Sequence, residues 1–219
     1  MSSEAPRRRG LMLVISSPSG AGKTSLSRRL VAEHPDLTVS VSATTRAPRP
    51  GEQEGREYHF VTPQAFADLV ERDAFLEWAQ VHDNRYGSPS AITMTALAAG
   101  LDVLFDIDWQ GARAIAGKAP EDTVRIFILP PTMAALAERL HTRAQDSETV
   151  IASRLAGART EIEKWGEYDY VIVNEDFETA YRALAAIYLA ECNRRTRNPW
   201  LTDFVGTLLP QDAPETAAS

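Results

Sequence analysis

Cysteine is almost absent from this chain of 219 residues, which has one, Cys192, so no disulfide can form within it. A single cysteine favours a reducing compartment. Long hydrophobic runs are also missing. The apolar residues 11–15 follow the basic residues 7–9 but stop at Ser16, whereas a secretion signal needs roughly 7 to 15 apolar residues. No stretch approaches the ~20 residues of a membrane span, so we expect a soluble, cytoplasmic protein with no membrane partner.

Positive charge is in the minority, because 23 lysines and arginines face 30 acidic residues and the formal net charge is -7. Such a surface repels a polyanion, which argues against nucleic acid as a partner. Any phosphate-binding site must therefore be a local basic cluster. The composition leaves open whether the chain forms a homo-oligomer.

Short apolar runs alternate along the chain with segments that have helical periodicity. The runs predict strands buried on both faces of a parallel sheet, and they lie at residues 11–15, 101–105, 124–129 and 170–173. The helical segments lie at residues 23–33, 89–99, 132–141 and 177–193. Strands that alternate with helices predict an α/β fold.

Two stretches interrupt this alternation. Residues 42–86 combine a loop rich in Pro, Gly and Arg with fragments of strand and helix, which indicates an inserted subdomain. Residues 144–167 are charged and helical, which is typical of a mobile lid. We expect disordered tails at residues 1–9 and from Pro210 onward.

Residues 16–25, Ser-Ser-Pro-Ser-Gly-Ala-Gly-Lys-Thr-Ser, follow the first predicted strand and open an amphipathic helix, the context that a phosphate-binding loop requires. Gly20 and Gly22 let consecutive N–H groups converge on a phosphate at the positive end of the helix. Lys23 would reach the β- and γ-phosphates of a nucleoside triphosphate, and the hydroxyl of Thr24 would bind magnesium. The candidate ATP-binding residues of the loop are Ser17, Pro18, Ser19, Gly20, Ala21, Gly22, Lys23 and Thr24. The usual pattern has glycine at position 17, so Ser17 leaves the geometry of the loop entry open.

A second basic cluster lies in residues 44–60. Arg46 and Arg49 present two planar guanidinium groups that match phosphate oxygens in pairs, and Tyr58 adds a phenolic donor. The two arginines alone are equally compatible with a solvated basic loop.

The whole string resembles the signature of the guanylate kinase family. Its defined positions are occupied here by Thr44, Thr45, Arg46, Arg49, Glu52, Gly55, Tyr58 and Phe60. The resemblance continues through residues 75–79, 86–88 and 106–111 and covers roughly residues 11–195. It implies a three-layer P-loop kinase fold with a central parallel sheet, in which magnesium-dependent transfer of the γ-phosphoryl group of ATP to GMP takes place.

By this resemblance, residues 10–195 form the kinase domain, with its core at 10–41, 87–134 and 168–195, a GMP-binding insert at 42–86 and a lid at 135–167, followed by a tail at 196–219. The implied GMP-binding residues are Ser42, Arg46, Arg49, Glu52, Tyr58, Glu77, Tyr86, Ser88, Asp106 and Asp108. A carboxylate at Glu77 accepts from guanine N1 and N2, and a hydroxyl at Ser42 donates to O6; adenine reverses this pattern. Of Asp106 and Asp108, one would serve hydrated magnesium and one the base. Asp108 is the prediction for guanine, and capping the helix that follows is the alternative.

Phosphoryl transfer needs cations around the γ-phosphate. Arg139 and Arg143 lie four residues apart on one helix face, and Arg154 lies on the next predicted helix. The resemblance implies that these three arginines and Lys23 are catalytic. It also places Asn174 near the adenine ring, although a turn residue at the end of a strand is an equal alternative.

Two other functions compete with this interpretation. One is a non-catalytic guanylate-kinase-like module that binds phosphopeptides. Such modules tend to lose the lysine of the phosphate loop and the arginines of the lid, which this chain keeps. The other is a P-loop kinase for a different acceptor, such as AMP or a small metabolite.

Overall fold

The computed structural model describes residues 8–143 and 148–209, with the backbone alone at Arg143. Five parallel strands form the central sheet in the order β2-β7-β1-β8-β9. They are β1 (Met12–Ser16), β2 (Leu37–Val39), β7 (Asp102–Asp106), β8 (Thr123–Leu129) and β9 (Tyr170–Val173). The α/β class and the parallel sheet predicted from the sequence are confirmed.

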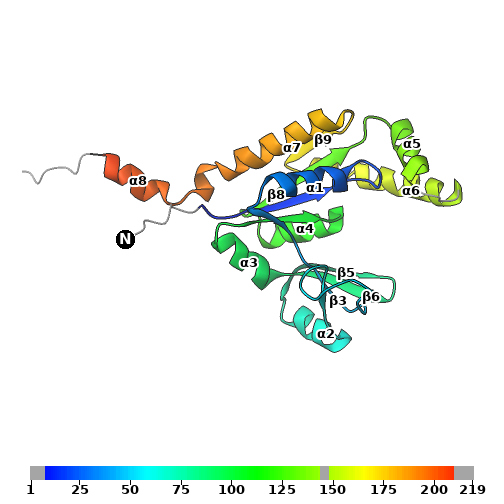
Figure 1. Cartoon of the computed structure of the whole chain (residues 1–219), viewed down its shortest axis with the longest axis horizontal. Coiled ribbons are helices and arrows are strands. Elements are labelled where there is room, and N and C mark those ends of the chain that lie inside the picture. Colours follow the sequence, from blue (N-terminus) through cyan, green and yellow to red (C-terminus); the bar gives the residue numbers. More distant parts are fainter. Residues whose placement is uncertain (1–7, 144–147, 210–219) are drawn as a thin grey trace, which may run out of the picture.

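Helices cover both faces of this sheet, because alternate side chains of its strands point to opposite sides. Leu13 and Ile15 of β1 face one side, toward α1 (Lys23–Glu33) and α7 (Phe177–Cys192). Met12 and Val14 face the other side, toward α3 (Ser90–Ala98) and α4 (Trp109–Lys118). The result is the three-layer arrangement seen in Figure 1.

A smaller sheet lies beside the main body, below it in Figure 1, and has the strand order β4-β3-β6-β5. Its elements are β3 (Ala43–Thr44), β4 (His59–Phe60), α2 (Pro63–Glu71), β5 (Phe75–Val81) and β6 (Asn84–Pro89). Phe66 of α2 stacks on Phe75 with ring centroids 4.6 Å apart, which gives this sheet an apolar centre of its own. The sheet occupies the part of the chain where the sequence predicts an insert.

Two helices, α5 (Met133–Arg143) and α6 (Glu148–Ile162), extend beyond the carboxyl ends of the main strands (Figure 1). Leu136 and Leu140 of α5 pack against Ile151 and Ala158 of α6 in a separate apolar cluster. The two helices therefore hold each other mainly through their own side chains. A short 3₁₀ helix, η1 (Trp165–Glu167), leads from α6 into β9.

The amino ends of the main strands lie at the opposite end of the molecule. Buried Asp102 accepts hydrogen bonds there from Arg8, from the backbone N–H of Leu11 at 2.8 Å and from the Tyr188 hydroxyl at 2.6 Å. Arg9 pairs with Asp122. The expected disordered tail at residues 1–9 is thus corrected at its last two positions, because these ion pairs hold them to the sheet; residues 1–7 lie outside the described part.

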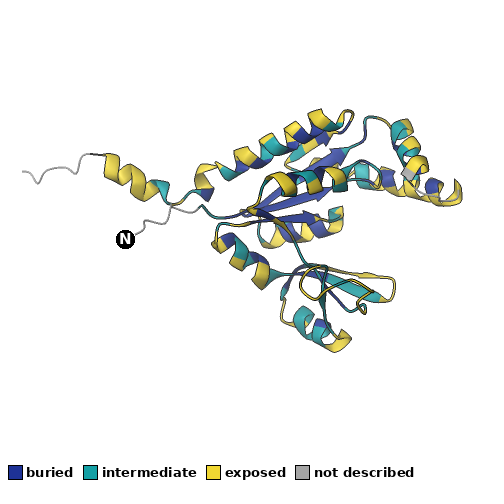
Figure 2. Ribbon diagram, viewed as in Figure 1, coloured by how far each residue is buried: buried dark blue, intermediate teal, exposed yellow. Residues whose placement is uncertain are grey.

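The chain continues through η2 (Arg195–Arg197) into α8 (Leu201–Leu208), which projects from the body and contains no buried residue, as the yellow ribbon in Figure 2 shows. The sequence places this helix inside a tail and does not predict it. The predicted disorder from Pro210 onward concerns residues outside the described part. Among the described helices, none combines the length and the apolar character needed to cross a membrane.

Candidate active site

The phosphate-binding loop occupies residues 17–22, between β1 and α1. Gly20 and Gly22 have φ angles of 92° and 100°, in the left-handed region that glycine enters without strain. Gly22 caps α1 without a side-chain hydrogen bond, so the N–H groups of the first turn stay available to an anion. The loop therefore has the backbone geometry of an anion site.

Ser17 occupies the position where the usual loop pattern has glycine. Its hydroxyl donates to the carbonyl oxygen of Pro18 at 3.0 Å. In the described part of the chain, Asp73 and His82 are the non-glycine residues with positive φ, and Ser17 is not among them. The loop entry thus needs no conformation that only glycine adopts, so serine fits here without backbone strain.

The loop is fixed from below by Asn174, which is 5% exposed and follows β9. Its side-chain amide donates to the carbonyl oxygen of Ala21 at 2.7 Å. Its own carbonyl oxygen accepts from Arg139 of α5 at 2.9 Å, and its N–H donates to Leu129 at 2.8 Å. The structure therefore places Asn174 as a strand-end residue that links the loop, β8 and α5, with its amide N–H group already engaged.

Lys23 forms an ion pair with Asp106, the last residue of β7, and the Thr24 hydroxyl lies 3.5 Å from the same carboxylate. Burial lowers the pKa of Lys23 to about 8, and the negative charges of Glu161 and Asp108 oppose this shift. A hydroxyl and a carboxylate beside a phosphate loop are the oxygen donors that Mg²⁺ prefers. The two residues fit a magnesium ion shared with substrate phosphates.

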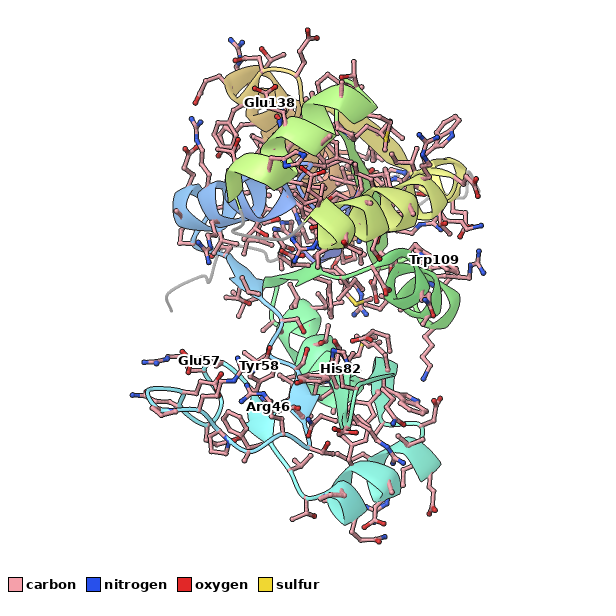
Figure 3. All side chains as sticks on the ribbon, turned by 90° about the vertical axis from the view of Figure 1, so that its right-hand side faces the viewer. Arg46, Glu57, Tyr58, His82, Trp109 and Glu138 are labelled. Carbon is pink, nitrogen blue, oxygen red and sulfur yellow. The ribbon has the colours of Figure 1, made fainter. Side chains whose placement is uncertain are left out.

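Arg46 lies on the small sheet at the centre of an aromatic and acidic group. Its guanidinium group donates to Glu52 at 2.8 Å and lies 5.3 Å from the centre of the Tyr58 ring. Tyr58 and Tyr86 meet edge to face at 5.8 Å. Figure 3 shows Arg46 and Tyr58 on the small sheet, across from α5 and α6. Glu52 also accepts from the backbone N–H of the exposed residue Arg49 at 2.7 Å, so it shapes the loop.

Glu77 of β5 accepts a hydrogen bond of 2.6 Å from the buried hydroxyl of Ser88. Burial raises the pKa of Glu77, the Ser88 hydrogen bond lowers it, and the nearby charge of Asp108 raises it further. Gly111 of α4 packs against Glu77, so this carboxylate lies where the small sheet meets the main body. Half-buried Ser42 immediately precedes β3 on the same sheet.

Asp108 caps α4 through hydrogen bonds of 3.0 Å to the N–H groups of Gln110 and Gly111. The capping alternative is thereby observed. Both capping hydrogen bonds go to Oδ1, and neither uses Oδ2. Asp108 is exposed and lies near Glu77 and Lys23, so its role toward substrate stays a prediction.

Of the two lid arginines whose side chains are described, Arg139 lies on α5 and Arg154 on α6. Arg139 is tied to Asn174 beneath the loop, and Arg154 lies on the exposed surface of α6. The side chain of Arg143 lies outside the described residues. The structure thus brings together the phosphate loop, the ends of β7 and β9, and Arg139 of α5, whereas the catalytic role of Arg154 stays a prediction.

The guanylate kinase family model matches residues 9–191 of the chain. The guanylate kinase of Caulobacter vibrioides is 55% identical over 204 residues, which cover 93% of this chain and 96% of that protein. The chain belongs to the guanylate kinase family. The guanylate kinase of Rhizobium meliloti is 55% identical over 94% of both chains. The crystal structure of guanylate kinase from Anaplasma phagocytophilum superposes with a TM-score of 0.73 at 35% identity, covering 94% of this chain and 99% of that one.

Membership of the guanylate kinase family confirms the resemblance stated from the sequence and, with the solved relative, the P-loop kinase fold. The match to these relatives extends over nearly their whole length, and both are named guanylate kinases. The non-catalytic module is therefore not favoured.

Two site residues escaped the sequence analysis. Glu161 lies on α6, two helical turns after Arg154, and interacts electrostatically with Lys23 and Asp108. Burial raises its pKa. The seven-residue spacing from Arg154 was the available signal. Tyr168 packs against Phe127 at 4.9 Å, and burial raises the pKa of its hydroxyl to about 12; nothing local in the sequence marks it.

Proposed function

We propose that this chain is a guanylate kinase, which transfers the γ-phosphoryl group of ATP to GMP and releases ADP and GDP. The observation that carries the proposal is the coexistence of a phosphate loop with the geometry of an anion site and a small sheet that bears Arg46 and Glu77, in a chain 55% identical to guanylate kinases. The first feature suits the donor and the second suits the acceptor.

ATP would bind with its phosphates on residues 17–24. The loop N–H groups and Lys23 would take the phosphate oxygens, and Thr24 with Asp106 would hold magnesium, which neutralises phosphate charge when bound. Lys23 would exchange its ion pair with Asp106 for the phosphates. Asn174 supports this site from beneath, through its bond to the Ala21 carbonyl.

GMP would bind on the small sheet. Arg46, Arg49, Tyr58 and Tyr86 would hold its phosphate, and Glu52 orients Arg46 for that contact. Ser42, Glu77 and Asp108 would contact guanine. The Ser88 hydroxyl donates to one oxygen of Glu77 and so orients the carboxylate toward the N1 and N2 donors of the base.

Arg139, Arg143 and Arg154 would gather around the transferring phosphoryl group as α5 and α6 close over it. Closure excludes water, which strengthens each charge–charge interaction and prevents hydrolysis of ATP. The acceptor is a phosphate oxygen that is anionic at neutral pH, so the mechanism needs no general base. We assign the enzyme to the cytoplasm, with ATP and GMP as its small-molecule partners.

The test is an assay of ADP release with ATP and magnesium in which GMP, AMP, CMP and UMP are offered separately. Turnover with GMP alone, lost in Lys23→Ala, is the expected result. Turnover with another monophosphate would favour a kinase for a different acceptor. A folded protein that turns over none of them, and that binds a phosphopeptide, would favour the non-catalytic module.

A further inference from the structure

A cavity of about 560 Å³ opens between the phosphate loop and α5. Its lining residues are Gly20, Gly22, Ser25, Glu138, Arg139 and Thr142. Side chains of Leu136 and Leu140 lie against Gly20, so α5 forms the roof. Figure 3 places Glu138 at the top of the molecule, far from Arg46 and Tyr58 on the small sheet. The cavity therefore does not belong to the acceptor side of the site.

The position of the cavity along the loop indicates which part of the donor it would receive. Lys23 points from the loop to Asp106 and lies near Asp108. Asp108 in turn neighbours Glu77 of the small sheet, and transfer to the acceptor would occur on this side. The cavity lies on the α5 side, bordered by the two loop glycines and by Ser25 in the first turn of α1. A triphosphate held by the loop with its γ-phosphate toward Lys23 would direct its α-phosphate and nucleoside toward this space. The first group of the nucleoside to enter the cavity would be the ribose, which is bonded directly to the α-phosphate.

Glu138 is the one acidic residue in the lining of this cavity. Its side chain is exposed, and no hydrogen bond or ion pair within residues 8–143 and 148–209 engages its carboxylate. The neighbouring Arg139 is held by the Asn174 carbonyl, so it fixes this wall of the cavity and is turned toward β9. A carboxylate is an acceptor only, and phosphates repel it. The groups on a nucleoside that it suits are hydroxyls and amines.

We propose that Glu138 binds the ribose of the nucleoside triphosphate donor by accepting hydrogen bonds from its 2′- and 3′-hydroxyls. Two adjacent hydroxyls match the two oxygens of one carboxylate, as paired donors do in other carboxylate contacts. This inference rests on the proposed function, in which ATP is the donor. It makes Glu138 a positioning residue that acts on donor affinity and takes no part in the transfer.

The test compares ATP with 2′,3′-dideoxy-ATP in the wild-type protein, in Glu138→Ala and in Glu138→Gln. At saturating GMP, Glu138→Ala should raise KM for ATP about tenfold, in line with hydrogen bonds to a charged group. It should leave KM for 2′,3′-dideoxy-ATP and both kcat values within about twofold, since those hydrogen bonds are absent there. Glu138→Gln keeps one acceptor oxygen, so its KM for ATP should lie between those of the wild type and of Glu138→Ala. Glu71→Ala, which removes an exposed carboxylate at the end of α2, is the matched control and should change none of these values.

An equal rise in KM for both nucleotides, or no rise for either, would overturn the inference. A rise that depends instead on the 6-amino group, detected with purine riboside triphosphate, would also overturn it by assigning Glu138 to the base. Calorimetric titration of each variant with ATP and with the dideoxy analogue measures the same difference without turnover. If the wild type binds ATP but phosphorylates no acceptor, the proposed function fails while this inference is still decided.

Discussion

The side-chain amide of Asn174 donates a hydrogen bond of 2.7 Å to the carbonyl oxygen of Ala21, although 153 positions separate the two residues. A Cβ atom at Gly22 would overlap that amide, so glycine is required there by close approach as well as by its φ of 100°. The end of β9 and the phosphate loop therefore form one unit.

Replacing Asn174 with alanine should disturb the donor site selectively. The buried Ala21 carbonyl loses its partner, which we expect to lower the free energy of unfolding by about 1–3 kcal/mol. KM for ATP should rise more than KM for GMP. Asn198→Ala removes a comparable amide bond, to the Cys192 carbonyl, at the far end of the molecule. That control should lose stability with no change in either KM, and identical kinetics for the two variants would contradict the role of Asn174.

Arg154→Ala should reduce turnover far more than it weakens binding. An arginine that stabilises a transferring phosphoryl group contributes roughly 10³ to 10⁵ in rate, an effect that is absent in the ground state. Steady-state kinetics with both substrates measures the split between kcat and KM. Arg159→Ala, on a different face of α6, is the control and should behave as the wild type. Equal losses in kcat and in affinity for Arg154→Ala would argue against the catalytic role.

The raised pKa of Glu77 predicts a pH dependence of GMP binding. Because the pKa of Glu77 is raised, its neutral carboxyl form becomes populated at a higher pH than that of an ordinary glutamate, whose pKa is about 4.3. The neutral form no longer accepts from both guanine N–H groups, so KM for GMP should rise on acidification while an ordinary glutamate would still be ionised. Glu77→Gln should bind weakly with no such step. KM for GMP is measured against pH in the wild type and in Glu77→Gln, and the ratio of the two KM values cancels the titration of the GMP phosphate itself. A ratio that does not change with pH would refute the prediction.

Asp102→Ala should destabilise the protein without altering its substrate affinity. The carboxylate is fully buried and accepts from Arg8, Leu11 and Tyr188, so its removal leaves buried donors without partners. Loss of one member of a buried charged network costs about 3–5 kcal/mol. Denaturant unfolding measures this, and Tyr188→Phe should cost about 1–2 kcal/mol by comparison. An unchanged midpoint for Asp102→Ala would show that the network contributes nothing to stability.

Cys192 should react slowly with alkylating reagents while the protein is folded. Burial raises the pKa of its thiol to about 11, and the charge of Asp102 adds to this. Only the thiolate reacts, so at pH 8 we expect a rate about 200-fold below that of an unfolded thiol of pKa about 8.5. Iodoacetamide labelling followed by mass spectrometry, with and without denaturant, gives the ratio. Similar rates in the two conditions would show that the thiol is not shielded.

Elements with a strong local pattern were predicted closely. The helix at residues 23–33 and the strand at residues 170–173 have the predicted bounds. The helix α4 was not predicted, because it is rich in small residues and Ile115 is the one large apolar side chain among its buried residues, Gly111, Ala112 and Ile115. The helix α8 buries nothing, so no pattern of burial identified it.

In the candidate site too, the residues within one local motif could be predicted, whereas the contacts between distant segments could not. Lys23, Thr24 and the loop glycines are neighbours in sequence, and their motif specifies their arrangement. The ion pair of Lys23 with Asp106 and the bond of Ser88 to Glu77 depend on how strands pair, which no local pattern contains. For Asn174 the sequence offers a position near the adenine ring or a turn at the end of a strand, and its hydrogen bond to the Ala21 carbonyl, which depends on the same strand pairing, is in neither prediction.

The backbone N–H of Arg9 donates to the carbonyl oxygen of Arg197 at 2.8 Å, at the end of the sheet away from the phosphate loop. The first and last segments of the folded body are therefore adjacent. A short peptide that joins them would close the body into a ring, and the ring could then be opened at an exposed turn elsewhere. Attachment to a solid support through this end would leave the substrate-binding end facing the solution.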